Sequence, residues 1–209
     1  MPDVATKTRE VLRLLNRYIV EIIEEYDICP WARQARLRGE IATEVVWGSP
    51  QLEDWIECSL ALLSRPAVRI AMIVAPQFEG TASEFQQLRD VVASRVVSAG
   101  VADFHPNAAQ DFSTPPRLVP YLRRSPHPML QLIPIAALEQ ARGRSHPVPV
   151  RSAQVRMLGG LAAPQPRAVA DRVAELNFER VRRDRERIAA AIADIHADRD
   201  LSCGRFSTR

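Results

Sequence analysis

The segment "DICPWAR", residues 27–33, contains a cysteine whose surroundings could make its thiol reactive. Pro30 suits the first turn of a short helix, and Cys29 would then be the N-cap, where exposed amide groups and the helix dipole favour the thiolate. Arg33 would add positive charge. If Cys29 instead ends the preceding helix, the carbonyl groups there disfavour the thiolate, and the cysteine can also simply pack as a small apolar side chain.

A second candidate is the segment of residues 104–133, "FHPNAAQDFSTPPRLVPYLRRSPHPMLQLI", which holds six prolines, two histidines and three arginines. Because prolines reduce the entropy lost on ordering, we expect a rigid loop at residues 106–128. Within it Arg124, Ser125 and His127 present a guanidinium, a hydroxyl and an imidazole. This combination suits recognition of a carboxylate or a phosphate.

His105 follows a predicted strand at its carboxyl end, which is where ligands bind in open α/β sheets. It could therefore face the same hollow as the downstream loop. The alternative for His105 and His127 is that each hydrogen-bonds a loop carbonyl and locks the turn. His146 and His196 are expected at the surface, and Cys58 is expected to pack on a helix.

Three functions follow from these two segments. The first is a small-molecule enzyme with Cys29 as nucleophile and His105 as general base, acting on a carboxylate or phosphate substrate. The second is a protein that binds such a small anionic molecule without catalysis. The third, ranked last, is a zinc or iron site formed by Cys29, His105 and His127. In the first two, the anion would be held by Arg33, Arg124, Ser125 and His127.

The composition excludes several other classes of function. The 209 residues carry a net charge of +3, and 25 acidic residues are interspersed with 28 basic ones, so we expect no nucleic-acid partner. Lys7 is the only lysine, which argues against imine chemistry. P-loop, dinucleotide-binding, zinc-protease and serine-hydrolase motifs are missing, and the sequence identifies no cofactor.

The cellular setting expected from the sequence is the cytoplasm. No stretch has the ~18–20 uninterrupted apolar residues of a membrane span, and the first residues lack the order of a secretory signal. The three cysteines show no Cys-x-x-Cys spacing, which argues against a disulfide framework or a zinc ribbon. We therefore expect reduced thiols and no membrane partner.

The elements that position these residues predict an α/β fold, with one mixed sheet of about four strands flanked by helices and a long C-terminal helix. Pro134 should place the last strand near an edge of the sheet. Ser49 with Pro50 is the predicted start of one helix, and Thr81 with Glu84 forms a predicted capping box for the next. The predicted strands are residues 40–47, 68–75, 101–105 and 129–135.

Three regions are expected along the chain: an α/β domain at residues 1–160, a linker and amphipathic helix at 161–197, and a disordered tail at 198–209. The helix carries an apolar stripe beside the charged run "ERVRRDRER". That stripe could fold back on its own domain or pair with a second subunit. A homodimer through this helix is therefore one expected partner arrangement.

Three motifs make the chain resemble the DUF1415 family, a bacterial family of uncharacterised proteins. They are "CPWAR" at residues 29–33, "FHP" at 104–106 and "RRSPHPMLQLI" at 123–133, and the similarity spans about residues 8–160. The resemblance implies that the two candidate segments form one site, and it supplies no reaction. This chain departs from the family motifs at Arg33 (lysine), Arg123 (asparagine), His127 (tyrosine) and Gln131 (histidine), so a metal site that needs the second histidine would be altered here.

Overall fold

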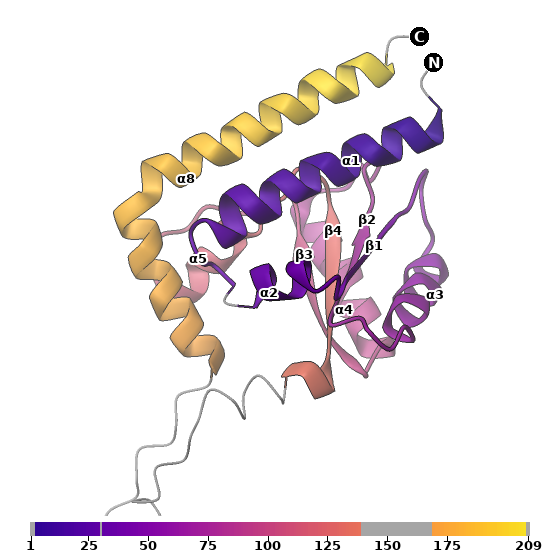
Figure 1. Ribbon diagram of the computed structural model, residues 1–209, viewed down its shortest axis with the longest axis horizontal. Coiled ribbons are helices and arrows are strands. Elements are labelled where there is room, and N and C mark those ends of the chain that lie inside the picture. Colours follow the sequence, from indigo (N-terminus) through magenta and orange to yellow (C-terminus); the bar gives the residue numbers. More distant parts are fainter. Residues whose placement is uncertain (1–2, 30, 139–168, 208–209) are drawn as a thin grey trace, which may run out of the picture.

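The structure, a computed structural model, describes residues 3–29, 31–138 and 169–207 (Figure 1). No helix within these ranges is both long and apolar enough to cross a lipid bilayer. The elements follow in the order α1 (Val4–Tyr18), the π-helix η1 (Ile19–Glu24), α2 (Ala32–Leu37), β1 (Ile41–Val45), α3 (Leu52–Leu63), β2 (Ile70–Val74), α4 (Ala82–Arg95), β3 (Ala99–Phe104), α5 (Pro115–Leu122), β4 (Met129–Pro134) and α8 (Val169–Ser207).

The sheet is four-stranded and mixed, as the sequence predicts. Its strand order is β1-β2-β4-β3, with β1 parallel to β2 and β4 antiparallel to both β2 and β3. The strand that Pro134 was expected to place near an edge, β4, is a central strand next to the edge strand β3, so the proline does not mark the edge itself. Pro134 is the last residue of β4, a position where a missing backbone N–H interrupts the ladder least.

The two faces of the sheet belong to two separate cores. Alternate residues of a strand point to opposite faces, so Met72 and Met129 lie in the core beneath α1, α5 and α8. Ile73 and Leu130 lie in the other core, with Trp55 of α3 and residues of α4. This division decides which of the predicted site residues can meet.

The helix starts agree only in part with the sequence prediction. Thr81 caps α4 and forms the expected capping box with Glu84. In contrast, α3 is capped by Gln51, whose partner in the box is Asp54, rather than by Ser49. A glutamine is an uncommon N-cap, so the Ser49–Pro50 pair is the stronger local signal and predicts the wrong boundary.

The proline-rich segment is not one continuous loop, because α5 interrupts it. Two prolines occupy the first two positions of this helix, where their missing N–H groups have no intrahelical partner to lose. A third, Pro120, lies inside the helix. Part of the rigid loop expected at residues 106–128 is therefore a short helix.

Helix α8 continues to Ser207, so the expectation of a disordered tail from residue 198 is wrong for the residues described. A non-helical residue, Asp184, bends it, and its second half runs beside α1 (Figure 1). Ile188, Ile192 and Ile195 are buried in the same core as α1. The expected boundary between domain and linker, at residues 160–161, lies outside the described residues, as does His146.

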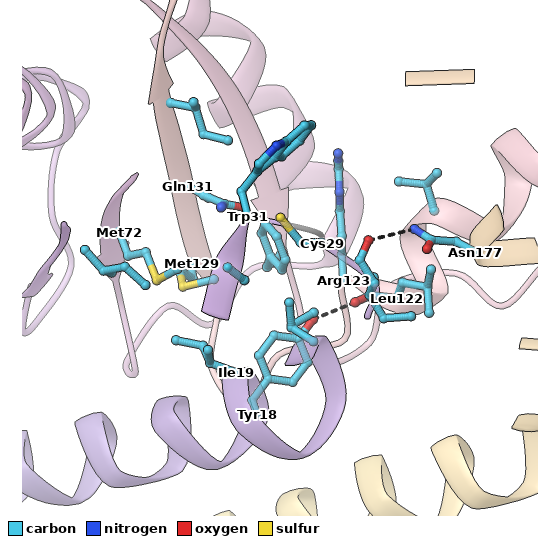
Figure 2. A pocket seen from close by; sticks show the side chains of 17 residues that line it. Tyr18, Ile19, Cys29, Trp31, Met72, Leu122, Arg123, Met129, Gln131 and Asn177 are labelled. Atoms are coloured by element: carbon cyan, nitrogen blue, oxygen red, sulfur yellow. Dashed lines mark hydrogen bonds between the residues drawn. The ribbon is translucent and has the colours of Figure 1, made fainter. Parts of the chain in front are cut away.

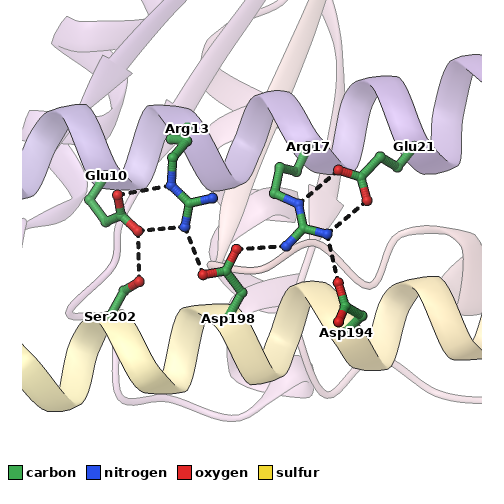
Figure 3. A network of polar contacts seen from close by, with 7 residues as sticks. All are labelled: Glu10, Arg13, Arg17, Glu21, Asp194, Asp198 and Ser202. Atoms are coloured by element: carbon green, nitrogen blue, oxygen red, sulfur yellow. Dashed lines mark hydrogen bonds and ion pairs between the residues drawn. The ribbon is translucent and has the colours of Figure 1, made fainter.

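A network of charged side chains fixes the end of α8 to α1 and explains why the helix persists (Figure 3). The Arg17 guanidinium lies 2.6 Å from both Asp194 and Asp198, and Arg13 lies 2.8 Å from Asp198. Ser202 donates a hydrogen bond to Glu10. Asp194 and Asp198 are four positions apart on α8, so successive turns meet the arginines of α1.

The apolar stripe of α8 is therefore used within the chain. Val181, Ile188, Ile192 and Ile195 are all buried against their own domain. A homodimer through this helix stays an untested prediction, and these four side chains are not available to form it.

Candidate functional site

A pocket of about 310 Å³ lies beneath α1 and η1, on the face of the sheet that carries Met72 and Met129 (Figure 2). Its walls are mainly apolar and include Tyr18, Trp31 and Phe104. Figure 2 shows the two methionines side by side, Cys29 close to Trp31 and Gln131, and Asn177 on the side away from the methionines. The volume is at the small end of the range for ligand pockets.

Cys29 lines this pocket, but its thiol is not activated. Burial raises the pKa of Cys29, and the negative charge of Asp27 acts in the same direction. The backbone N–H groups of Trp31 and Ala32 oppose the rise without overcoming it. The expectation that a helix start would favour the thiolate is therefore wrong in sign, because desolvation outweighs the two amide dipoles.

The turn that carries Cys29 is held by α8. Asn177 donates a hydrogen bond to the carbonyl of Ile28 at 3.0 Å, and the Arg180 guanidinium contacts both the carbonyl and the carboxylate of Asp27. Asp27 has a left-handed backbone, with φ of 49°. Such a conformation is uncommon outside glycine, so these contacts hold a turn that the local sequence disfavours.

Arg123 is the one cationic side chain among the described residues that line the pocket. Its guanidinium lies over the Phe104 ring, 5.6 Å from the centroid. Burial lowers the pKa of Arg123, and the nearby Asp103 opposes that effect. The Asp103 carboxylate is 3.8 Å away and lies nearer to Arg89, at 3.2 Å, while Arg89 also pairs with Asp90 at 2.8 Å.

The pocket also contains the carboxamide side chains of Gln131 and Asn177. Gln131 faces Met72 across the β2–β4 ladder and is half-buried. The Tyr18 hydroxyl already donates to the carbonyl of Leu122, so its hydrogen is used within the protein. The pocket therefore combines aromatic walls with one guanidinium and two carboxamides, those of Gln131 and Asn177.

His105 lies on the opposite face of the sheet from Cys29. Its ring packs against Phe85 of α4, its Nε2 atom is 3.2 Å from the carbonyl of Gly80, and its Nδ1 atom accepts the N–H of Asn107. Burial lowers its pKa. Because both nitrogens fix loops, His105 has the structural role given as the alternative and does not meet the thiol.

A tight turn contains Arg124, Ser125 and His127, and α8 packs against it. The Ser125 hydroxyl donates to the carbonyl of His127 at 2.6 Å, and the turn also receives Arg199, whose guanidinium donates to the carbonyl of Pro126. His127 is buried, and desolvation together with Arg199 lowers its pKa to about 4. None of the three predicted residues lines the pocket that contains Cys29.

Arg33 does not line that pocket either. Its side chain is 66% exposed and lies 3.6 Å from Glu24, which pairs more closely with Arg36 at 2.6 Å. The predicted metal site of Cys29, His105 and His127 is not assembled either, because Cys29 and His105 lie on different faces of the sheet. Within the described ranges, no three histidine, cysteine, aspartate or glutamate side chains are grouped to hold a metal ion.

Sequence reasoning missed the pocket residues Tyr18, Arg123, Gln131 and Asn177. In the sequence, Arg123 and Gln131 stand out only as departures from the family motif. Neither belongs to the predicted anion-binding residues of that segment, Arg124, Ser125 and His127. Asn177 sits in a helix whose charged run gives no sign of an inward-facing amide. Also missed was His196, expected at the surface, whose Nε2 atom is 3.3 Å from the carbonyl of Arg124.

Comparison with known proteins gives one match. The family model described as "Protein of unknown function (DUF1415)" matches residues 10–156. No curated protein and no solved structure matches the chain. The matched segment includes every pocket-lining element except α8.

Proposed function

The chain belongs to the DUF1415 family, and we propose that it binds a small organic anion with an apolar body in the pocket beside Cys29. The observation that carries this proposal is the position of Arg123, a partly buried cation that lines a mainly apolar and aromatic cavity. Such a cavity favours an apolar body by desolvation, and the guanidinium favours a carboxylate or similar group.

The local charge supports an anion rather than a neutral molecule. Among the described residues, the carboxylate paired with Arg123 is that of Asp103, 3.8 Å away, and it lies closer to Arg89, which also pairs with Asp90 at 2.8 Å. A ligand carboxylate could therefore pair with Arg123 without displacing a close internal ion pair. In a cavity of low polarity, such a pairing is stronger than at the surface.

Binding fits the pocket better than the cysteine–histidine catalysis considered from the sequence. The described residues that line it include no histidine, aspartate or glutamate to act as a general base. The thiol of Cys29 has a raised pKa, which disfavours the nucleophilic form at neutral pH. Cys29 is thus a wall residue in this proposal.

A matched pair of probes tests the charge requirement. Octanoate and 1-octanol share an alkyl chain and differ in the head group, and their binding can be followed through the ¹³C-methyl resonances of methionine, since Met72 and Met129 line the pocket. We expect octanoate to bind at least about ten-fold more tightly, with the advantage lost in Arg123→Gln. Arg117→Gln is the control, because Arg117 is an exposed side chain of α5 that does not line the pocket. Equal affinity of the two probes for the unaltered protein would refute the proposal.

A further inference from the structure

A second hollow, of about 400 Å³, lies between the end of α5 and the second half of α8. It shares no lining residue with the pocket beside Cys29. On the α8 side it is lined by Ile192 and by three alanines, Ala189, Ala193 and Ala197, whose small side chains leave the space open. On the other side are Tyr121 and Arg124.

Arg124 presents a fixed guanidinium to this hollow. Its Nε atom donates to the carbonyl of Pro106 at 2.9 Å, which sets the plane of the group. Within the ranges that the structure describes, neither terminal nitrogen has a carboxylate within 4.0 Å or a hydrogen-bond acceptor. Two parallel N–H groups are therefore available for a bidentate contact with an oxyanion.

Tyr121 supplies an independent sign of a missing ligand. The residue is only 2% exposed, and among the described residues its hydroxyl has no hydrogen-bond partner. Buried hydroxyl groups are nearly always paired, because leaving water without a new partner is costly. Tyr121 and Arg124 line the same hollow, and Arg124 is one of two arginines that act on the Tyr121 hydroxyl electrostatically, the other being Arg185.

The negative charge that lies near Arg124 in the hollow is balanced by another arginine. Asp200 is its one acidic lining residue in the described part of the chain, and that carboxylate pairs with Arg199 at 2.6 Å. The His196 imidazole also lines the hollow, with Nε2 near the carbonyl of Arg124. A dianion with several oxygens fits this arrangement of donors better than a single carboxylate does.

We propose that this hollow is a second binding site, for a small phosphate monoester. The phosphate lies between the Arg124 guanidinium and the Tyr121 hydroxyl, and the organic group lies against Ile192 and the alanines of α8. The site is separate from the pocket of the proposed function and does not depend on it.

The test uses phenyl phosphate as the probe, with inorganic phosphate and benzoate as comparison ligands, in calorimetric titrations at constant ionic strength. We expect phenyl phosphate to bind most tightly. Arg124→Gln should weaken its binding on the order of ten-fold or more, and Tyr121→Phe about three-fold or more. Tyr121→Phe removes a hydroxyl that has no internal partner among the described residues, so its fold should be retained.

A control variant and a blocking ligand separate this site from the other one. Arg117→Gln should leave phenyl phosphate affinity unchanged, since that residue does not line the hollow. Because phenyl phosphate and benzoate also belong to the class of anions proposed for the pocket beside Cys29, the titrations are made with that pocket saturated by octanoate. Absence of saturable phenyl phosphate binding by the unaltered protein up to about 10 mM would overturn the proposal. So would full affinity in a folded Arg124→Gln variant, or benzoate binding as tightly as phenyl phosphate.

Discussion

Phe104 and His105 are adjacent in the chain, yet their side chains lie on opposite faces of the sheet. Phe104 lines the pocket that contains Cys29, whereas the His105 ring packs against Phe85 beneath α4. The alternation of a β-strand thus separates the imidazole from the thiol. What remains around the thiol is a guanidinium, two amides and aromatic rings, which is a set of groups suited to recognition.

His105 should affect stability and not ligand affinity. His105→Phe keeps the ring volume and removes the hydrogen bonds to Gly80 and Asn107, so the free energy of unfolding should fall by about 1–3 kcal/mol. Urea unfolding measures this loss, and octanoate affinity should be unchanged in the folded variant. A variant of normal stability that no longer binds octanoate would restore a catalytic or binding role for the imidazole.

Cys29 should react slowly with iodoacetamide at pH 7. Burial raises its pKa, and the thiolate is the reactive form. Peptide-resolved mass spectrometry should show alkylation of Cys29 well below the rate in urea-unfolded protein, and slower still with saturating octanoate. Cys58, whose pKa burial raises to about 11, is the internal reference, since octanoate should not protect it. Alkylation of Cys29 faster than in the unfolded chain would contradict a raised pKa of this thiol.

Acid should destabilise the protein through His127. In the folded state His127 stays neutral down to about pH 4, because it is buried and faces Arg199 and His196, with Asp200 opposing them. The unfolded chain takes up that proton near pH 6.5, so the contribution is favourable above pH 6.5 and is lost as the pH falls towards 4. The loss approaches about 3 kcal/mol, since a tenfold change in proton affinity is about 1.4 kcal/mol. Urea midpoints of the unaltered protein and His127→Gln, compared from pH 8 to pH 4, should converge as the pH falls; parallel curves would show that His127 does not titrate this way.

Arg17 should anchor the end of α8. Arg17→Gln removes contacts with Asp194 and Asp198 in a partly shielded network, and we expect a loss of about 1–2 kcal/mol in the free energy of unfolding at low salt. The loss should shrink in 0.5 M NaCl because salt screens exposed pairs. Arg9→Gln, an exposed arginine on α1 that bonds only to nearby Thr6 among the contacts described, is the matched control. Equal stability of the two variants would show that the network contributes nothing.

The sheet was predictable from the sequence because its strands are continuous apolar runs or end at clear turn signals. The strand order was not, because β4 pairs between β2 and β3 through contacts distant in the chain. Local cues also misled at Pro134, where a residue typical of edges ends a central strand, and at residue 198, where a charged segment is stabilised by partners on α1.

The candidate pocket contains one of the residues predicted from the sequence, Cys29, and none of its predicted companions. Cys29 does line a pocket, and the downstream segment does contribute a guanidinium to it, but from Arg123 instead of Arg124. A single-residue shift of this kind depends on how the chain leaves α5, which no local pattern specifies. The desolvation that raises the Cys29 pKa is likewise a property of the packed core.

The last helix lies beyond the segment shared with the family, yet Asn177 from it forms part of the pocket wall and grips the carbonyl of Ile28. Substitutions in that helix can therefore reshape the rim of the cavity while the sheet and the three motifs stay intact. For the ligand proposed here, this helix would offer a means of changing preference that is independent of the residues that match the family.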